Sequence, residues 1–245
     1  MRDLLDAEIP LVAVSFGDED SERLAQEAKA AGVDVAELRV DRFSRTDPDH
    51  VLEQVRAFAS LPVLATVRSP LEGGEWKGTE EERLALFRRL APEVQAVDIE
   101  LSSRAILADV VSAAHENDAL AIVSHHDFAR TPATGELEKV VAEAKEAGAD
   151  VVKVSTMVTC DSDVKRLASL LLKEGADPAG TRLIVIAMGP IGAVSRVFFP
   201  ALGSPITYSF MGSTSSAPGQ LDFAETFRLL RAFYPGFHQR KSQAS

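Results

Sequence analysis

The chain alternates between short apolar runs and longer amphipathic stretches. The apolar runs are nearly continuous in Val, Ile, Leu and Ala, which is typical of parallel strands covered on both faces. They span residues 9–15, 34–40, 62–67, 96–101, 119–124, 150–154, 183–188 and 205–210. The charge-rich stretches between them have helical periodicity and span residues 20–31, 48–59, 79–90, 103–117, 136–147, 162–174, 192–201 and 222–233.

This alternation predicts the α/β class, specifically a (β/α)8 TIM barrel that forms a single domain over residues 1–245. An open, doubly wound parallel sheet is the alternative. Its glycine-rich fingerprint is missing after the first strand, where Gly17 stands alone between Phe16 and Asp18. The polar residues 236–245 are expected to form a frayed tail.

The charge of the chain argues against one class of partner, and its cysteine content excludes two kinds of site. Lys and Arg number 26 against 37 Asp and Glu, so the net charge is −11 with neutral histidines. This excess of acid argues against nucleic acid, which requires a basic surface. Cys160 is the only cysteine, so the chain has neither an internal disulfide nor a cysteine-based zinc site.

The chain also lacks the sequence features of a membrane or secreted protein. Its longest apolar runs, such as residues 183–188, are far shorter than the ~20 residues that span a membrane. Acidic residues stand near the start, where a signal peptide would be apolar. We therefore expect a cytoplasmic protein without membrane contact.

Charged residues follow the second and third predicted strands, at the end of a barrel where function is located. Alternation places Glu37, Arg39 and Asp41 on one side of the second strand. Because buried charges are costly unless paired or used, they form either a buried Glu–Arg ion pair or part of a site. Arg68 ends the third strand, and the glycines of Glu72-Gly73-Gly74 form either a ligand-binding turn or a plain surface turn.

The fifth and sixth predicted strands carry the clearest chemistry. His125 and His126 point to opposite faces of a strand, so they cannot easily share an ion and we predict no metal site. An inward-facing histidine near carboxylates is a general acid or base, although a lone histidine is more often packed or exposed. Lys153 lies between valines, where burial disfavours its ammonium form. A neutral amine there can form a Schiff base with a carbonyl; snorkelling to solvent is the alternative.

Residues after the last two predicted strands are suited to an anionic ligand. Arg196 can present its planar guanidinium to a carboxylate. The loop over residues 212–220 is small, polar and bounded by glycine, which is typical of a lid and equally of a flexible surface loop.

Together, the residues at these strand ends resemble the type I 3-dehydroquinate dehydratase family. Each motif is weak alone, but the set occurs in register over nearly the whole chain. The motifs are Glu37-Leu38-Arg39-Val40-Asp41, Thr66-Val67-Arg68 with Glu72-Gly73-Gly74, Asp98-Ile99-Glu100-Leu101, Ser124-His125-His126-Asp127-Phe128-Ala129-Arg130-Thr131-Pro132, Val152-Lys153-Val154, Met188-Gly189 with Ser195-Arg196, and Ser216-Ala217-Pro218-Gly219-Gln220.

The resemblance implies a lyase without cofactor that dehydrates 3-dehydroquinate to 3-dehydroshikimate through an imine, and a homodimer. Lys153 matches the Schiff-base lysine, His126 the general acid and base, and Glu72 the carboxylate that orients it. His126 is preferred to His125 because Asp-Phe follows it directly. Arg196 matches the group that binds the substrate carboxylate. The other matching substrate-binding and lid positions are Glu37, Arg39, Arg68, Ser216 and Gln220, and Ser215 could share the contact of Ser216.

Two other functions stay open at this point. A class I aldolase of sugar phosphates also uses a Schiff-base lysine, but it requires a phosphate site of glycines and a helix start. A metabolite-sensing module of the same fold without catalysis would be expected to lose Lys153 or His126, and the chain retains both.

Overall fold

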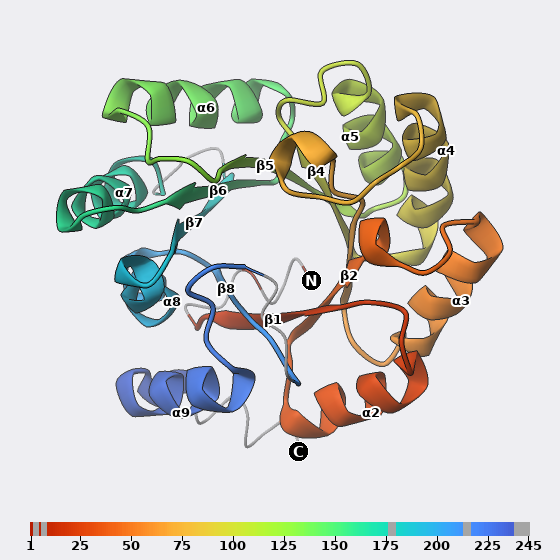
Figure 1. Cartoon of the computed structure of the whole chain (residues 1–245), viewed down its shortest axis with the longest axis horizontal. Coiled ribbons are helices and arrows are strands. Elements are labelled where there is room, and N and C mark those ends of the chain that lie inside the picture. Colours follow the sequence, from red (N-terminus) through yellow and green to blue (C-terminus); the bar gives the residue numbers. More distant parts are fainter. Residues whose placement is uncertain (2–4, 6–8, 176–179, 213–216, 238–245) are drawn as a thin grey trace.

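Eight parallel strands surround a common axis, and the helices lie outside them (Figure 1). The structure is a computed structural model that describes residues 1, 5, 9–175, 180–212 and 217–237. The strands are β1 (Leu11–Phe16), β2 (Val35–Arg39), β3 (Val63–Thr66), β4 (Ala96–Glu100), β5 (Leu120–Asp127), β6 (Val151–Met157), β7 (Arg182–Met188) and β8 (Ile206–Ser209). The helices are α2 (Ser21–Ala31), α3 (Pro48–Ala57), α4 (Glu80–Leu90), α5 (Leu107–Glu116), α6 (Thr134–Glu146), α7 (Asp161–Glu174), α8 (Ser195–Phe198) and α9 (Phe223–Phe233).

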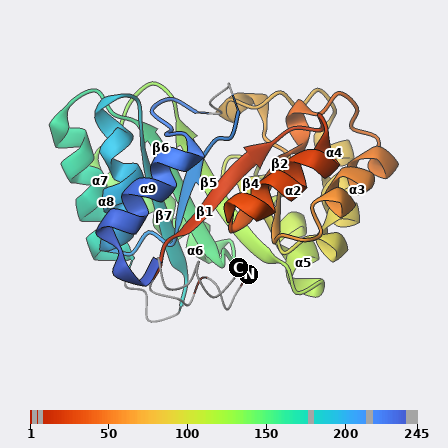
Figure 2. The ribbon, with the colours of Figure 1, turned by 90° about the horizontal axis from the view of Figure 1, so that it is seen from below.

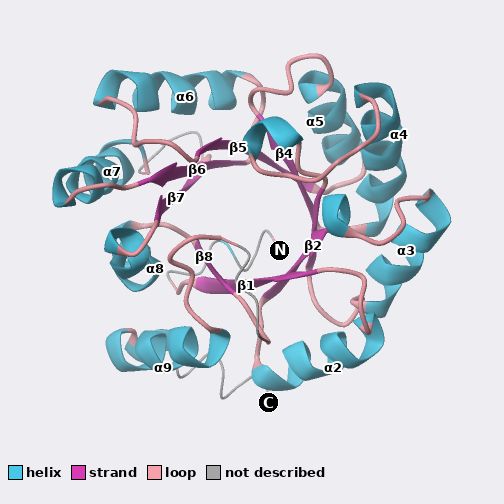
Figure 3. Ribbon diagram, viewed as in Figure 1, coloured by secondary structure: helices cyan, strands magenta, loops and turns pink. Residues whose placement is uncertain are grey.

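The strands pair in the order β7-β6-β5-β4-β3-β2-β1-β8, which forms a nearly closed barrel (Figure 3). The segment around α8 spans the seam between β7 and β8. The hydroxyl of Ser195 accepts a hydrogen bond from the backbone N–H of Ala187 on β7 (3.3 Å), and Thr207 on β8 donates to the carbonyl of Arg196 (2.8 Å). The predicted barrel is therefore confirmed, and the open sheet is excluded.

The apolar runs are nearly continuous because each strand is buried on both faces. In β2, Val35 packs with inward-facing residues of other strands, whereas Ala36 and Leu38 pack under the helices. Since all strands run the same way, their carboxyl ends gather at one end of the barrel (Figure 2). Side chains from distant parts of the sequence meet there.

Some element boundaries differ from the predicted ones. β5 continues through His125 and His126 to Asp127, and β6 continues to Met157, because these polar residues stay in register across the two strands. Instead of one helix over 192–201, α8 is a single α-helical turn between 3-10 turns at Ile191–Val194 and Phe199–Leu202.

Phe237 lies within the stretch for which the sequence predicts a frayed tail. It is fully buried, and its ring centroid lies 5.2 Å from that of Phe227 on α9. Residues 238–245 of the predicted tail lie outside the described residues. In the described ranges, no helix has the length and apolar character needed to cross a membrane.

Candidate active site

A cavity, partly open to solvent, lies at the carboxyl ends of the strands. The predicted site residues that line it are Glu37, Arg39, Arg68, Glu72, His126, Lys153, Arg196 and Gln220. Ser216, like Ser215, lies outside the described residues. The structure thus brings together residues that are up to 183 positions apart in the sequence (from 37 to 220).

Lys153 is buried in the barrel rather than snorkelling to solvent, with only 4% of its surface exposed. Its Nζ lies 3.0 Å from Oδ2 of Asp98 and 3.8 Å from Oε1 of Glu37. Burial opposes the charged form of Asp98, but Arg68 and Lys153 hold the pKa of its carboxyl well below the usual range. An ionised Asp98 compensates the buried ammonium and holds the amine in place.

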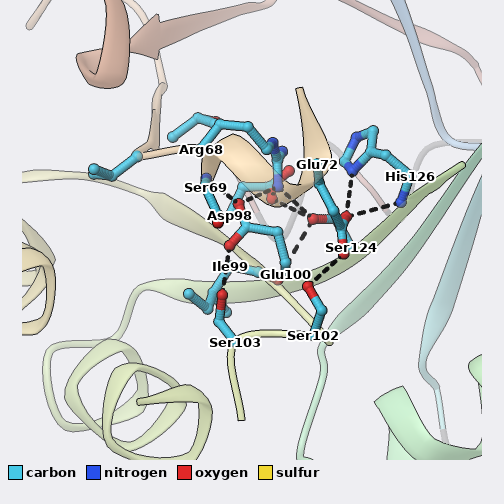
Figure 4. Close-up of polar contacts among 12 residues, drawn as sticks. Arg68, Ser69, Glu72, Asp98, Ile99, Glu100, Ser102, Ser103, Ser124 and His126 are labelled. Atoms are coloured by element: carbon cyan, nitrogen blue, oxygen red, sulfur yellow. Dashed lines mark hydrogen bonds and ion pairs between the residues drawn. The ribbon is translucent and has the colours of Figure 1, made fainter. Parts of the chain in front are cut away.

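Arg68 connects this pair to a second carboxylate (Figure 4). Its guanidinium donates to Asp98 (2.8 Å), to Glu100 (2.7 Å) and to the hydroxyl of Ser124 (2.7 Å). Burial opposes its charge, yet Asp98 and Glu100 raise the pKa of Arg68 above its usual value. Arg68, which the sequence suggests as a substrate-binding residue, lines the cavity and binds the carboxylates of Asp98 and Glu100.

Glu100 is bound by a second, completely buried arginine that enters from outside the barrel. Arg83 on α4 lies 3.0 Å from Oε2 of Glu100, and it donates to the carbonyl of Val67 (3.2 Å). The hydroxyl of Ser103 donates to the same Oε2 (2.8 Å). α4 is held by a capping box at its start, in which Thr79 accepts from the backbone N–H of Glu82 and the Glu82 carboxylate accepts from that of Thr79.

His126 and Glu72 form a separate pair at the cavity (Figure 4). One oxygen of Glu72 lies 3.0 Å from Nδ1 of His126 and accepts a hydrogen bond from its backbone N–H (2.8 Å). The other oxygen accepts from the hydroxyl of Ser102 (2.6 Å). These bonds fix the orientation of the imidazole ring and favour the tautomer with a proton on Nδ1.

The environment of the pair shifts both ionisations. Burial raises the pKa of Glu72 to about 7, against the opposing hydrogen bond from Ser102. Burial, together with the positive charges of Arg68 and Lys153, lowers the pKa of His126 well below its usual value. His126 is therefore neutral near neutral pH, as a general base must be.

The turn that carries Glu72 depends on glycine. Gly73 has a φ of 76°, and a Cβ on Gly74 would stand 2.0 Å from the carbonyl oxygen of Arg68. On this turn, an oxygen of Glu72 lies 3.0 Å from Nδ1 of His126. The glycines therefore shape a turn of the site.

Arg39 pairs with a different carboxylate from the one suggested by the sequence. It binds Asp41 through two hydrogen bonds of 2.9 and 2.7 Å, so the Glu–Arg ion pair weighed for this strand is an Arg–Asp pair. Glu37 instead accepts hydrogen bonds from the hydroxyls of Ser15 and Thr66 and faces Lys153. Both side chains line the cavity.

Arg196 is the cation of the cavity that is best placed for an anionic ligand. It is 2% exposed, and its Nε and Nη2 have no hydrogen-bond partner within the part of the chain that the structure describes. Burial lowers the pKa of Arg196 to about 10, which leaves it charged near neutral pH. A bound carboxylate would satisfy both the charge and the free donors.

Comparison with known proteins agrees with these features. The type I 3-dehydroquinase family matches residues 9–235. The chain belongs to this family. A 3-dehydroquinate dehydratase from Methanosarcina barkeri is 38% identical over 236 residues, which cover 92% of this chain and 96% of the relative.

Solved structures of the family share the same fold. The 3-dehydroquinate dehydratase of Aquifex aeolicus VF5 superposes with a TM-score of 0.82 at 33% identity, over 92% of this chain and 99% of the other. The type I enzyme of Clostridium difficile, solved with covalently modified comenic acid, superposes with a TM-score of 0.85 at 28% identity, over 93% of each chain.

For this type I 3-dehydroquinase, the structure adds residues to which sequence reasoning gave no role. Asp98 and Glu100 are outside the described cavity lining and bind Arg68. In the sequence they stand out as Lys153 does, as charged residues within an apolar strand. Arg42, Phe128, Ser155 and Tyr208 line the cavity, and Phe128 stacks on His126 with ring centroids 6.3 Å apart. His125 is absent from the described lining, and no group of three or more metal-ligating side chains occurs among the described residues.

Removing the charge of Arg83 should destabilise the barrel. Arg83→Met leaves Glu100 with one arginine fewer in a site without solvent, so we expect the free energy of unfolding to fall by about 3–5 kcal/mol. Arg88→Met, on the same helix, breaks only an exposed ion pair with Asp109. It should change the free energy of unfolding by less than about 1 kcal/mol. Urea unfolding followed by circular dichroism measures both. Equal effects in the two variants would contradict the role of Arg83.

Proposed function

We propose that this chain dehydrates 3-dehydroquinate to 3-dehydroshikimate through an imine on Lys153. The observation that carries the proposal is a buried lysine, compensated by Asp98, in the same cavity as the His126–Glu72 pair. Membership of the type I 3-dehydroquinase family supports this reaction over the aldolase and sensor alternatives. Action in the cytoplasm and a homodimer stay predictions.

The reaction begins with addition of Lys153 to the ketone. The ammonium gives one proton to His126, and the resulting neutral amine forms a bond from Nζ to C3. Return of that proton and loss of the carbonyl oxygen as water leave a protonated imine. Asp98 and Glu37 remain beside the nitrogen and stabilise its positive charge. The two carboxylates therefore stabilise the positive charge of the ammonium before the addition and that of the iminium after it.

His126 then carries the proton transfers. Its Nε2 takes the proton from C2, and the electron pair of that C–H bond moves into the imine to form an enamine. The enamine electrons expel the C1 hydroxyl, which leaves as water with the proton from His126. Hydrolysis of the remaining imine frees the product and regenerates the lysine.

Glu72 prepares the histidine for this role. An Nδ1–H that donates to Glu72 leaves the lone pair of Nε2 free to accept the C2 proton. When His126 becomes protonated, the same carboxylate stabilises the imidazolium. Arg196 binds the substrate carboxylate, while Arg39 and Gln220 supply further polar groups at the cavity.

Borohydride tests the imine directly. With 3-dehydroquinate present, it should reduce the intermediate to a stable amine, inactivate the enzyme and leave an adduct on Lys153 that peptide mass spectrometry locates. Lys153→Met should be inactive and form no adduct. Lys139→Met, which changes an exposed lysine of α6, should react as wild type does. An active wild-type enzyme that is neither modified nor inactivated would exclude the mechanism.

The two adjacent histidines should differ sharply. His126→Ala removes the acid and base, so we expect kcat to fall by about 10²–10⁴-fold. His125→Ala should keep kcat near the wild-type value, because the described cavity lining includes His126 and not His125. The ultraviolet absorbance of the conjugated enone product measures both rates. A reversed result would overturn the choice of His126.

The acid limb of the pH profile should report on Glu72. As pH falls through about 7, Glu72 becomes protonated and stops accepting the Nδ1 hydrogen bond, so kcat should decline. His126 does not produce this limb, because its pKa lies well below the usual value. Glu72→Gln holds a neutral amide at every pH and should have a low kcat without the limb. The same limb in that variant would assign it to another group.

A further inference from the structure

Tyr208 lies beside the reactive lysine, near the carboxyl end of β8. It pairs in register with Ala13 of β1 and packs with the inward-facing residues of the barrel. Only 4% of its surface is exposed, and it lines the same cavity as Lys153 and Arg196. The sequence motifs that carry the family resemblance do not include this position.

The aromatic ring of Tyr208 contacts the charge of the lysine. Nζ of Lys153 lies 4.3 Å from the ring centroid, which is within the distance for a cation–π interaction. The electron-rich face of the ring stabilises a positive nitrogen whether it is an ammonium or a protonated imine. The ring therefore adds to the stabilisation that Asp98 and Glu37 give to the same atom.

The hydroxyl of Tyr208 has no hydrogen-bond partner among the described residues, although it is fully buried. Burial raises the pKa of Tyr208 well above its usual value, so the group stays an O–H donor. A buried donor without a partner is costly and rare in folded proteins. The hydroxyl of Ser155, two residues beyond Lys153, and two nitrogens of Arg196 share this condition in the same cavity.

We propose that Tyr208 is a further substrate-contacting residue, whose ring stabilises the positive nitrogen of Lys153 and whose hydroxyl donates a hydrogen bond to an oxygen of the bound substrate. This inference rests on the proposed function. A cyclic polyol acid attached to Nζ through C3 carries oxygens on neighbouring carbons, beside the ring that contacts Nζ. Such an oxygen supplies the acceptor that the hydroxyl of Tyr208 lacks among the described residues.

Two substitutions separate the roles of the ring and the hydroxyl. Tyr208→Phe keeps the ring and removes the donor, so KM for 3-dehydroquinate should rise about 3–20-fold while kcat stays within about threefold of wild type. Tyr208→Leu also removes the ring, so kcat should fall about tenfold further, with slower inactivation by borohydride. Tyr208→Met provides a second variant without a ring if the leucine variant does not fold.

The only other tyrosine is a matched control. The hydroxyl of Tyr234 donates to the carbonyl of Val197 (2.6 Å), and Tyr234 is not part of the described cavity lining. Tyr234→Phe should therefore leave KM and kcat unchanged. Circular dichroism establishes that each variant is folded.

The outcomes are distinct for each part of the inference. A wild-type KM in Tyr208→Phe would overturn the hydrogen bond to substrate. Equal kcat values in Tyr208→Phe and the variants without a ring would overturn the stabilisation of the nitrogen. If borohydride fails to modify the wild-type enzyme, the proposed imine reaction itself is wrong, whereas a modified wild type together with unaffected Tyr208 variants overturns this inference alone.

Discussion

A buried positive nitrogen requires a negative neighbour, and this requirement organises the interior of the barrel. Glu100, Arg68, Asp98 and Lys153 follow one another in alternating charge, with contacts of 2.7, 2.8 and 3.0 Å. Each charge is shielded from water and would be costly alone. Removal of any member leaves its neighbours with less compensation. The lysine therefore depends also on Glu100, which is outside the described cavity lining.

The parallel barrel makes this arrangement possible. Asp98 and Glu100 are two positions apart on β4, so alternation turns both to the same side, where Arg68 binds both. Arg83 reaches Glu100 from α4, outside the strands. Hence the outer helix layer contributes to the charge balance beside the cavity. The buried ion pairs that stabilise the barrel also hold the charged groups around Lys153.

The polar side chains of the cavity form two sets, which differ in whether the protein supplies their partners. One set is satisfied by protein partners: Lys153 by Asp98, and His126 by Glu72. The other set, Arg196 and Tyr208, presents polar atoms without a partner among the described residues. Groups of the first set are held in place before a ligand arrives, which limits the reorganisation needed during the reaction. Groups of the second set supply binding energy only when a ligand carries the complementary oxygens.

The sequence by itself determined the alternation of strands and helices, the barrel class and the position of Lys153 within an apolar strand, because burial and periodicity are local properties. It also identified the family through its strand-end motifs. Only the tertiary structure decided that Arg39 pairs with Asp41, that Arg83 supports Glu100 and that Tyr208 faces the lysine nitrogen. The contacts of Arg83 and Tyr208 join different elements of the chain, whereas Arg39 and Asp41 are two residues apart. In each case the partner is selected by distance in space, which periodicity does not give. The ends of β5 and β6 were misplaced for the same reason, since residues that are polar because they face a cavity look like the end of a strand.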